Sequence, residues 1–195
     1  MGEIMEIQKN SANSVGIASD LLKKGKIAIL PTDTIYGFSG IVPDTEQQIH
    51  ALKGRDEGKP FIQLIADPDD LSHFCAERIN ANLLHMWPAG ITIIVRNQQG
   101  GTTGFRCPGD VWLRNVIRQT GLSLYSTSVN KAGQPPLTKI SDIQKEFSQV
   151  VSLIVNDGDN TTSVASTIVD TTGNSEYQII RQGTLVIPQE CLQRP

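Results

Sequence analysis

Short apolar runs recur along the whole chain, and several of them stop abruptly in polar residues. The clearest is Ile27–Leu30, four apolar residues that are followed directly by Pro-Thr-Asp-Thr. Runs of this length bounded by turn-forming residues are typical of buried strands, and the longer amphipathic segments between them are typical of helices. Because the chain mixes the two from end to end, it predicts an α/β or α+β fold with helices flanking one large, twisted, mixed β-sheet.

The length of 195 residues suits one domain with a substantial hydrophobic core. No composition shift or repeat marks an internal boundary, so we predict a single domain over residues 1–195. The Gly- and Pro-rich segment Gln98–Gly109 is interpreted as an irregular loop of that domain.

Caps and hydrophobic spacing place the individual elements. The helices are expected from Asn10 or Ser11 to Lys24 with Gly25 as terminator, from Asp44 through Leu52 with an Asp44–Gln47 capping box, across a helical region from Asp67-Pro68 to Met86, and over Ser141–Phe147. The strands are expected at Ile27–Leu30, Phe61–Ala66, Ile91–Val95, Val111–Leu113, Leu122–Tyr125, Val150–Val155, Ser166–Asp170 and Tyr177–Arg181.

Composition excludes several classes of protein. The formal net charge of −3 and the pI of about 5.6 argue against a global electrostatic grip on nucleic acid or an anionic membrane. The cysteines show no CxxC pair and the histidines no metal-ligand spacing, so no structural zinc site is expected and no metal ligand can be named. No signal-like or membrane-spanning segment is visible, and we predict a cytoplasmic protein without membrane contact. The cysteines referred to above are Cys75, Cys107 and Cys191, and the histidines are His50, His73 and His85.

Three expected strands end in polar clusters. Ile27–Leu30 is followed by "PTDT", Leu122–Tyr125 by "STSVNKAGQPP", and Val150–Val155 by "NDGDNTTSVAST". Such residues also make ordinary turns. In open α/β sheets, however, ligands collect beyond strand ends, and three clusters together favour a binding site.

Two cations, Lys53 and Arg55, flank Gly54 where the helix from Asp44 is expected to end. They could complement the helix dipole, or they could clamp phosphates, for which the planar fork of arginine and the point charge of lysine are well suited. No Walker motif and no strand-linked GxGxxG is present.

The segment Ser126–Asn130 places hydroxyl groups and an amide in one short stretch. Such groups can orient a nucleotide without ionising. A serine nucleophile is not expected, because the chain has no GxSxG and no histidine in any of the three clusters.

The motifs "PTDTIYGF", "KGR…KPF", "WPAGITIIV", "STSVN…GQPP", "STIVD" and "IIRQG" resemble, in order and spacing, the YrdC-like threonylcarbamoyl-AMP synthases. The resemblance extends from about Lys23 to Gly183. It implies one α/β domain with a large twisted mixed sheet around a positively lined cavity. It also implies the reaction of L-threonine, bicarbonate and ATP to threonylcarbamoyl-AMP and pyrophosphate, used for adenosine 37 of tRNAs. Longer members carry a C-terminal domain for which these 195 residues have no room.

The resemblance also implies roles for single residues. Thr34, with Tyr36 nearby, and Ser166 are similar to threonine contacts, and Arg114 in "VWLRN" to the arginine that pairs with the substrate carboxylate. Five further residues are similar to the family's nucleotide contacts: Lys53, Arg55, Ser128, Asn130 and Arg181. Of these, Lys53 and Arg55 correspond to the catalytic cations.

This chemistry requires positioning and charge neutralisation more than a protein nucleophile. ATP implies Mg²⁺, held mostly by phosphates and water. Partner proteins that complete the transfer to tRNA are implied as well, and direct tRNA binding is left open.

Three positions depart from the family pattern. The family often has alanine where this chain has Val129, glutamate where it has Ala165, and in some members histidine where it has Leu64. Two alternatives to the synthase therefore stay open. One is a non-catalytic RNA-binding module, against which the charge and the 5% aromatic content count. The other is a diverged paralogue that binds a nucleotide and another small acyl acceptor.

Overall fold

A computed structural model describes residues 4–54, 60–161 and 164–195. Its strands are β1 (Met5–Gln8), β2 (Ala28–Leu30), β3 (Gly37–Ile41), β4 (Ile62–Leu64), β5 (Ile91–Arg96), β6 (Thr102–Arg106), β7 (Leu124–Ser128), β8 (Leu153–Asn156), β9 (Thr167–Asp170) and β10 (Gln178–Arg181). Its helices are α1 (Ser14–Lys23), α2 (Glu46–Lys53), α3 (Ala81–Leu84), α4 (Val111–Thr120) and α5 (Ile140–Phe147), with the 3₁₀ helices η1 (Pro68–His73) and η2 (Gln189–Cys191).

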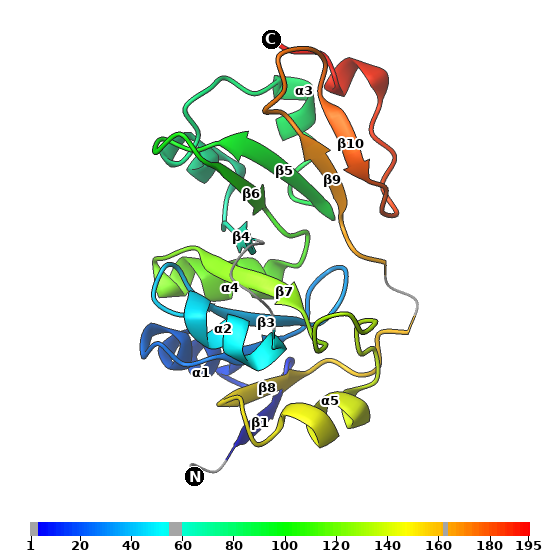
Figure 1. Ribbon diagram of the computed structural model, residues 1–195. Coiled ribbons are helices and arrows are strands. Elements are labelled where there is room, and N and C mark those ends of the chain that lie inside the picture. The colour runs from blue at the N-terminus through cyan, green and yellow to red at the C-terminus, as the bar shows by residue number, and fades with distance from the viewer. Residues whose placement is uncertain (1–3, 55–59, 162–163) are drawn as a thin grey trace.

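All the described strands belong to one sheet, in the order β1-β8-β2-β3-β7-β4-β6-β5-β9-β10. Pairing is parallel between β1 and β8, β8 and β2, β4 and β6, and β5 and β9, and it is antiparallel elsewhere. Figure 1 shows this sheet twisting from β1 at one end to β10 at the other. The predicted fold class, a large twisted mixed sheet with helices, is confirmed.

The two halves of the sheet are covered differently (Figure 1). One half consists of β1, β8, β2, β3 and β7, named here the β1–β7 half, and the other of β6, β5, β9 and β10, named the β6–β10 half. The β1–β7 half has helices on both faces: α1 and α4 pack on one, α2 and α5 on the other. The half from β6 to β10 buries one face under η1, α3, η2 and the C-terminal segment, through Ile91, Ile93 and Val95 of β5. Because side chains alternate along a strand, Thr92 and Ile94 point to the opposite face.

Helix α4 corrects a prediction, since Val111–Leu113 was expected to be a strand. Asp110 caps the helix by accepting a hydrogen bond from the Leu113 amide at 2.9 Å, and Gly121 ends it with φ 73°. Leu113, Val116, Ile117 and Thr120 are all buried, which is the spacing of a helix face. The strand was predicted because the helix begins with β-branched and aromatic residues, which favour strands, and the helical spacing of the buried residues was overlooked.

Three strands were missed. β1 is an edge strand, and β3 is rich in glycine; a Cβ at its Gly40 would lie 2.3 Å from Oγ1 of Thr45, so β3 passes too close to α2 for a larger residue. β6 lies inside the segment expected to be irregular, and it forms a hairpin with β5 closed by the Asn97 amide and the Gly101 carbonyl at 2.9 Å.

Two helix predictions also need correction. α2 begins at Glu46 after Thr45, not at Asp44, and has no side-chain cap. The segment from Asp67 to Met86 is not continuously helical: η1 starts with a capping box formed by Asp67 and Asp70, and α3 is a separate short helix. The predicted helix near the N-terminus and the helix over Ser141–Phe147 correspond to α1 and α5. No helix in the described part of the chain is both long and apolar enough to cross a bilayer.

Candidate functional site

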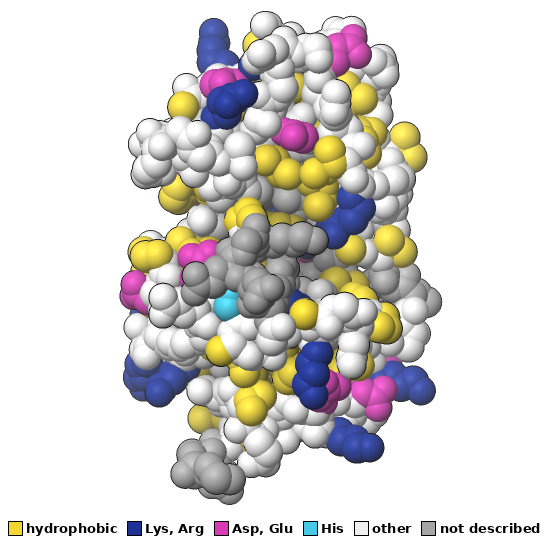
Figure 2. Space-filling model, in the orientation of Figure 1, with side chains coloured by type: hydrophobic (Ala, Val, Ile, Leu, Met, Phe, Trp, Pro, Cys, Tyr) yellow, Lys and Arg dark blue, Asp and Glu magenta, His cyan; other side chains and the backbone are white. Residues whose placement is uncertain are grey.

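A cavity of about 680 Å³ lies over the open face of the β6–β10 half, where the twisted sheet meets the loops after β2 and β7. Its floor is apolar and its walls carry hydroxyl groups and two arginines. The floor residues include Ile62, Ile94, Ile168 and Ile180, the hydroxyl residues are Thr32, Thr34, Ser126, Thr127, Ser128 and Ser166, and the arginines are Arg106 and Arg181. Figure 2 shows the hollow between the two halves of the molecule, with hydrophobic and dark blue cationic side chains beside it.

Arg106, the last residue of β6, is the most buried charge in this cavity, with 5% of its surface exposed. One terminal nitrogen donates to Oγ1 of Thr34 at 2.7 Å, and the other pairs with the Asp33 carboxylate. Its Nε is buried and, within the described residues, has no hydrogen-bond partner. Burial lowers the pKa of the Arg106 guanidinium, while the Asp33 carboxylate opposes that shift. An arginine oriented in this way suits a carboxylate or a phosphate ligand.

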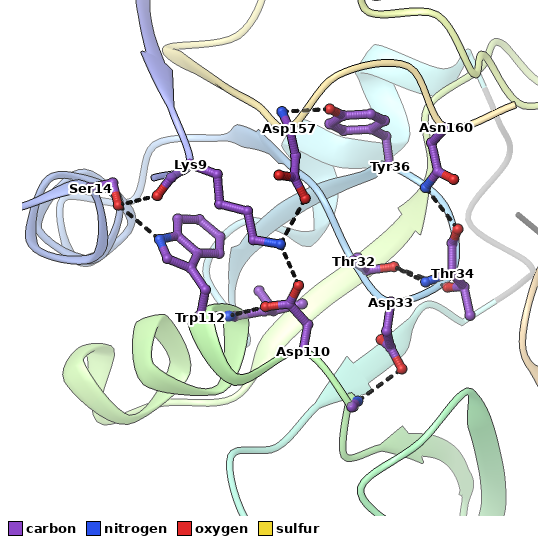
Figure 3. Close-up of polar contacts among 12 residues, drawn as sticks. Lys9, Ser14, Thr32, Asp33, Thr34, Tyr36, Asp110, Trp112, Asp157 and Asn160 are labelled. Atoms are coloured by element: carbon purple, nitrogen blue, oxygen red, sulfur yellow. Dashed lines mark hydrogen bonds and ion pairs between the residues drawn. The ribbon is translucent and has the colours of Figure 1, made fainter. Parts of the chain in front are cut away.

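The "PTDT" loop holds Arg106 from the other side. The Thr32 hydroxyl accepts a hydrogen bond from the Thr34 amide at 3.0 Å and donates one to the Ile35 carbonyl at 2.8 Å, which closes a tight turn. Asp33 accepts a second hydrogen bond from the Gly109 amide at 2.8 Å, as Figure 3 shows. The predicted hydroxyl of Thr34 is therefore fixed at the cavity wall, and Asp33 orients the arginine beside it.

Tyr36 lines the cavity but is 1% exposed, and its hydroxyl is fully used by the loop after β8. It donates to the Gly158 carbonyl at 2.8 Å and accepts from the Asp157 amide at 2.8 Å. Asn160 of the same loop donates to the Thr34 carbonyl at 2.9 Å (Figure 3). Two hydrogen-bonded links thus tie the "PTDT" loop to the end of β8.

Ser166 and Arg181 also belong to the wall of the cavity. The Ser166 hydroxyl lies 2.8 Å from the Thr92 hydroxyl, and Arg181 reaches the carbonyl and the hydroxyl of Ser166 at 2.9 and 3.1 Å. Burial lowers the pKa of the Arg181 guanidinium. Arg181 has no carboxylate partner within the described ranges, so the two arginines are balanced by the single carboxylate of Asp33. The cavity therefore favours an anion.

Ser128 and Asn130 lie together at the end of β7, as the sequence predicted, but Asn130 faces inward. Its Oδ1 accepts from the Ser128 hydroxyl at 2.5 Å and from Lys53 Nζ at 3.0 Å, and its amide nitrogen donates to the Lys131 and Gln134 carbonyls. Lys53 is 3% exposed and also donates to the Ser128 carbonyl at 2.7 Å. In this arrangement Lys53 and Asn130 hold the loop, while Ser128 faces the cavity.

Two predicted residues remain, Arg55 and Arg114. Arg55 lies outside the described residues. Arg114 is not among the described residues that line the cavity: it belongs to α4, its Nε is buried without a hydrogen-bond partner in the described part, and its charge acts on Cys107 and Asp67. The structure gives the position at the cavity to Arg106 instead, which sequence reasoning missed because β6 was taken for a loop.

The three departures from the family pattern fall in different places. Ala165 lines the cavity, whereas Leu64 and Val129 are buried in the core. Thus only Ala165 alters the cavity wall directly. No group of three His, Cys, Asp or Glu side chains that could hold a metal occurs among the residues the structure describes.

Fold and site together define a mixed α/β protein with a polar, cationic cavity for a small anionic ligand. A sequence model of the Sua5/YciO/YrdC family, described as telomere recombination, matches residues 20–183, and the chain belongs to that family.

Several curated relatives are threonylcarbamoyl-AMP synthases by name. The chain is 26% identical over 167 residues to the threonylcarbamoyl-AMP synthase of Bacillus subtilis, covering 78% of this chain and 48% of that protein. It is 27% identical over 161 residues to the threonylcarbamoyl-AMP synthase of Chromohalobacter salexigens, covering 75% of this chain and 86% of that protein. Against the B. subtilis protein and the rat synthase, the chain spans 48% and 64% of the relative's length.

Solved structures share the fold. P. abyssi Sua5 complexed with L-threonine superposes with a TM-score of 0.84 at 23% identity, covering 93% of this chain and 58% of that one. E. coli YciO superposes with a TM-score of 0.81 at 19% identity, covering 94% and 97%.

Proposed function

We propose that the chain is an L-threonylcarbamoyladenylate synthase, which condenses L-threonine, bicarbonate and ATP into threonylcarbamoyl-AMP and pyrophosphate. The observation that carries the proposal is the buried guanidinium of Arg106, held by Asp33 and Thr34 at the cavity wall. Membership of the family and the name of the curated relatives support it.

The amino-acid half of the site is assigned to the Arg106 side of the cavity. The guanidinium would pair with the carboxylate of threonine, because its Nε has no hydrogen-bond partner among the described residues, Asp33 is the single described carboxylate that balances Arg106 and Arg181, and arginine binds carboxylates in a planar fork. The hydroxyl groups of Thr34 and Ser166 lie on the walls beside it and are available to a small polar substrate.

The nucleotide half is assigned to Arg181 and Ser128, with Lys53 and Asn130 supporting the loop that carries Ser128. Direct phosphate contacts of Lys53 and Arg55 remain predictions. For Lys53 to reach a phosphate, its ammonium would exchange hydrogen bonds that it now donates to the Ser128 and Asn130 carbonyls.

Mg²⁺ is part of the proposal as the companion of ATP. The described lining residues include hydroxyls and arginines but no carboxylate, which fits an ion held mainly by phosphates and water. When bound, the ion supplies neutralisation of phosphate charge. The protein's own residues bind and orient the substrates, and the two arginines stabilise negative charge.

The product would serve modification of adenosine 37 in tRNA. Transfer by partner proteins, direct tRNA contact and a cytoplasmic location belong to the same proposal and are predictions. The negative net charge of −3 gives no support to a broad RNA-binding surface.

Pyrophosphate release tests the proposal directly. We expect release only when L-threonine, bicarbonate and ATP with Mg²⁺ are all present. In parallel, ATP with Mg²⁺ should raise the melting temperature, and L-threonine should add to it far more than L-alanine, since a ligand of the native state stabilises it by mass action. Equal shifts with threonine and alanine would exclude the threonine assignment, and no shift with ATP would favour the RNA-binding module.

A second candidate is a diverged paralogue that joins a nucleotide to another small acyl acceptor. The specific observation in its favour is Ala165, which removes from the cavity wall the glutamate that the family often has. Pyrophosphate release that depends on ATP and bicarbonate, is absent with threonine and appears with another amino acid would establish this candidate.

A further inference from the structure

Lys9 lies directly after the edge strand β1 and outside residues 20–183, the part that the family shares. Its backbone is held on both sides. The amide donates to the Asn156 carbonyl at 2.9 Å, and the carbonyl accepts from the Ser14 hydroxyl at 2.6 Å. Trp112 of α4 donates to that same hydroxyl at 2.9 Å. The position of this lysine is therefore fixed by β8, α1 and α4.

The Lys9 side chain bridges two carboxylates that come from distant parts of the chain (Figure 3). Its Nζ lies 2.5 Å from Asp110 and 2.7 Å from Asp157. The side chains of Lys9 and Asp110 are 20% and 12% exposed. Burial alone would lower the pKa of the Lys9 ammonium, but hydrogen bonds and charge from both carboxylates outweigh it and raise that pKa. Lys9 therefore keeps its positive charge at neutral pH.

Each of the two aspartates is connected, through its backbone or its neighbour, to a residue that holds the cavity wall. The Asp157 amide donates to the hydroxyl of Tyr36, which anchors the end of the "PTDT" loop. Asp110 follows Gly109, whose amide donates to Asp33, and Asp33 orients Arg106. Lys9 thus joins the loop after β8 to the start of α4. The contacts from both carboxylates end at the "PTDT" loop: Tyr36 follows this loop, and Arg106 donates to the hydroxyl of its Thr34.

Removal of the lysine charge would leave Asp110 and Asp157 without the cation that bridges them. Like charges this close repel, and Asp157 would separate from the start of α4. A shift of the loop after β8 relative to the start of α4 would misplace Tyr36 and Arg106, and small displacements of binding groups have large effects on substrate use.

We propose that Lys9 is a positioning residue for the amino-acid half of the site. It acts through Asp157 on Tyr36 and through Asp110 and Gly109 on Asp33 and Arg106, and it touches no substrate. The inference rests on the proposed function for its kinetic readout but not for its structural one.

The experiment compares the full chain with Lys9→Met, Lys9→Arg and the double variant Lys9→Met/Asp157→Asn, and uses Lys145→Met as a control for an exposed lysine of α5. Two quantities are measured: the KM and kcat for threonine and ATP in pyrophosphate release, and amide hydrogen exchange of residues 31–37 and 156–160 in the ligand-free protein.

For Lys9→Met we expect the KM for threonine to rise about 5- to 30-fold, with kcat and the KM for ATP within about twofold, because positioning of one substrate is lost. Lys9→Arg should stay within about threefold of the parent, since arginine can also bridge two carboxylates. The double variant should recover most of the effect, because it removes one of the two repelling charges. If the ion pair only stabilised the fold, Lys9→Met would lower the melting temperature without raising the KM for threonine selectively.

Exchange separates failure of the inference from failure of the proposed function. If the parent shows no threonine-dependent release, the function is wrong, and faster exchange of residues 31–37 and 156–160 in Lys9→Met still supports the positioning role. Unchanged exchange of both segments in Lys9→Met, or an unchanged KM for threonine in an active protein, overturns it.

Discussion

At the scale of single residues, Arg106 differs from the other described arginines because its whole side chain is buried and its hydrogen-bonding capacity is only partly used. Asp33 and Thr34 occupy its two terminal nitrogens, and its Nε is left without a partner among the described residues. A buried charge with unused hydrogen-bonding capacity is costly unless a ligand completes it. The residue is therefore the strongest single indication of where an anionic substrate binds.

Arg106→Lys should lower threonine-dependent pyrophosphate release strongly while keeping the charge. A lysine cannot provide the planar fork, and loss of charge-assisted hydrogen bonds worth roughly 2–4 kcal/mol corresponds to a decrease on the order of 30- to 1,000-fold. Steady-state assays at saturating ATP and bicarbonate measure it. The comparison is Arg114→Lys, which changes the arginine that the sequence had favoured. A larger loss in Arg114→Lys than in Arg106→Lys would return the carboxylate contact to α4.

Asn130 and Lys53 illustrate a second residue-level point. If Asn130 only contacts the nucleotide, as the family resemblance implies, Asn130→Ala should weaken nucleotide use and leave the fold intact. The structure instead predicts a loss of stability of about 1–3 kcal/mol, because the buried ammonium of Lys53 and the Ser128 hydroxyl lose the acceptor Oδ1. Urea unfolding of the parent and the variant measures the difference. Unchanged stability combined with weak nucleotide use would restore the first interpretation.

At the scale of elements, local signals predicted most of the helices and strands and failed where tertiary contacts decide. The strands at Ile27, Ile91, Val150 and Ser166 were found because their apolar residues are continuous and their ends are polar. β3 and β6 were missed because glycine weakens the local signal, while both are held by neighbouring strands on either side. α4 was missed because its cap, Asp110, directly follows the Gly- and Pro-rich segment Gln98–Gly109, and because the helix begins with a β-branched and an aromatic residue.

The candidate site follows the same division. Hydroxyl groups of the "PTDT" and "STSVN" segments were predicted, because these segments carry their information locally. Arg106 and Asp33 were not, because their pairing joins residues 73 positions apart and depends on β6 being a strand. The inward orientation of Asn130 depends on Lys53, which reaches it from α2, 77 positions away. Sequence patterns give no direct measure of such pairings.

The cap of α4 gives a prediction at this scale. Asp110→Ala removes both the hydrogen bond to the Leu113 amide and the ion pair with Lys9, and should cost about 1–2 kcal/mol of stability. Asp110→Asn keeps an oxygen acceptor for the amide and should cost less. Denaturant unfolding of both variants measures the two contributions. An equal loss in Asp110→Asn and Asp110→Ala would show that the ion pair, not the cap, dominates.

At the scale of the whole molecule, unequal covering of the sheet produces the cavity. Helices close both faces of the β1–β7 half, which contains the aromatic cluster of Phe38, Phe61 and Phe147, but only one face of the β6–β10 half. Thr92, Ile94 and Arg106 lie on the open face: Ile94 and Arg106 line the cavity, and Thr92 contacts Ser166 of its wall. The half of the sheet that is covered on both faces thus supports the half whose open face forms the cavity.

The three tyrosines provide a test of this packing. Tyr36, Tyr125 and Tyr177 are 1%, 5% and 4% exposed, and burial raises the pKa of each phenol above its ordinary value of 10.0. The charge of Glu46 beside Tyr125 adds to its shift. In the unfolded chain the phenols lose their protons near the ordinary value, whereas in the folded protein they keep them to higher pH.

Above pH 10 the unfolded state therefore binds fewer protons than the folded state, and the free energy of unfolding falls as the pH rises. The slope approaches about 1.4 kcal/mol per pH unit for each of the three phenols, and the contribution is fully present below pH 10. Unfolding free energies between neutral and strongly alkaline pH, with absorbance at 295 nm as the measure of phenolate, follow both quantities. Tyr125→Phe should reduce the slope by the share of one phenol. Ionisation of all three tyrosines at their ordinary pKa in a protein that stays folded would contradict the burial of these side chains, because a phenolate is formed so readily only in contact with water.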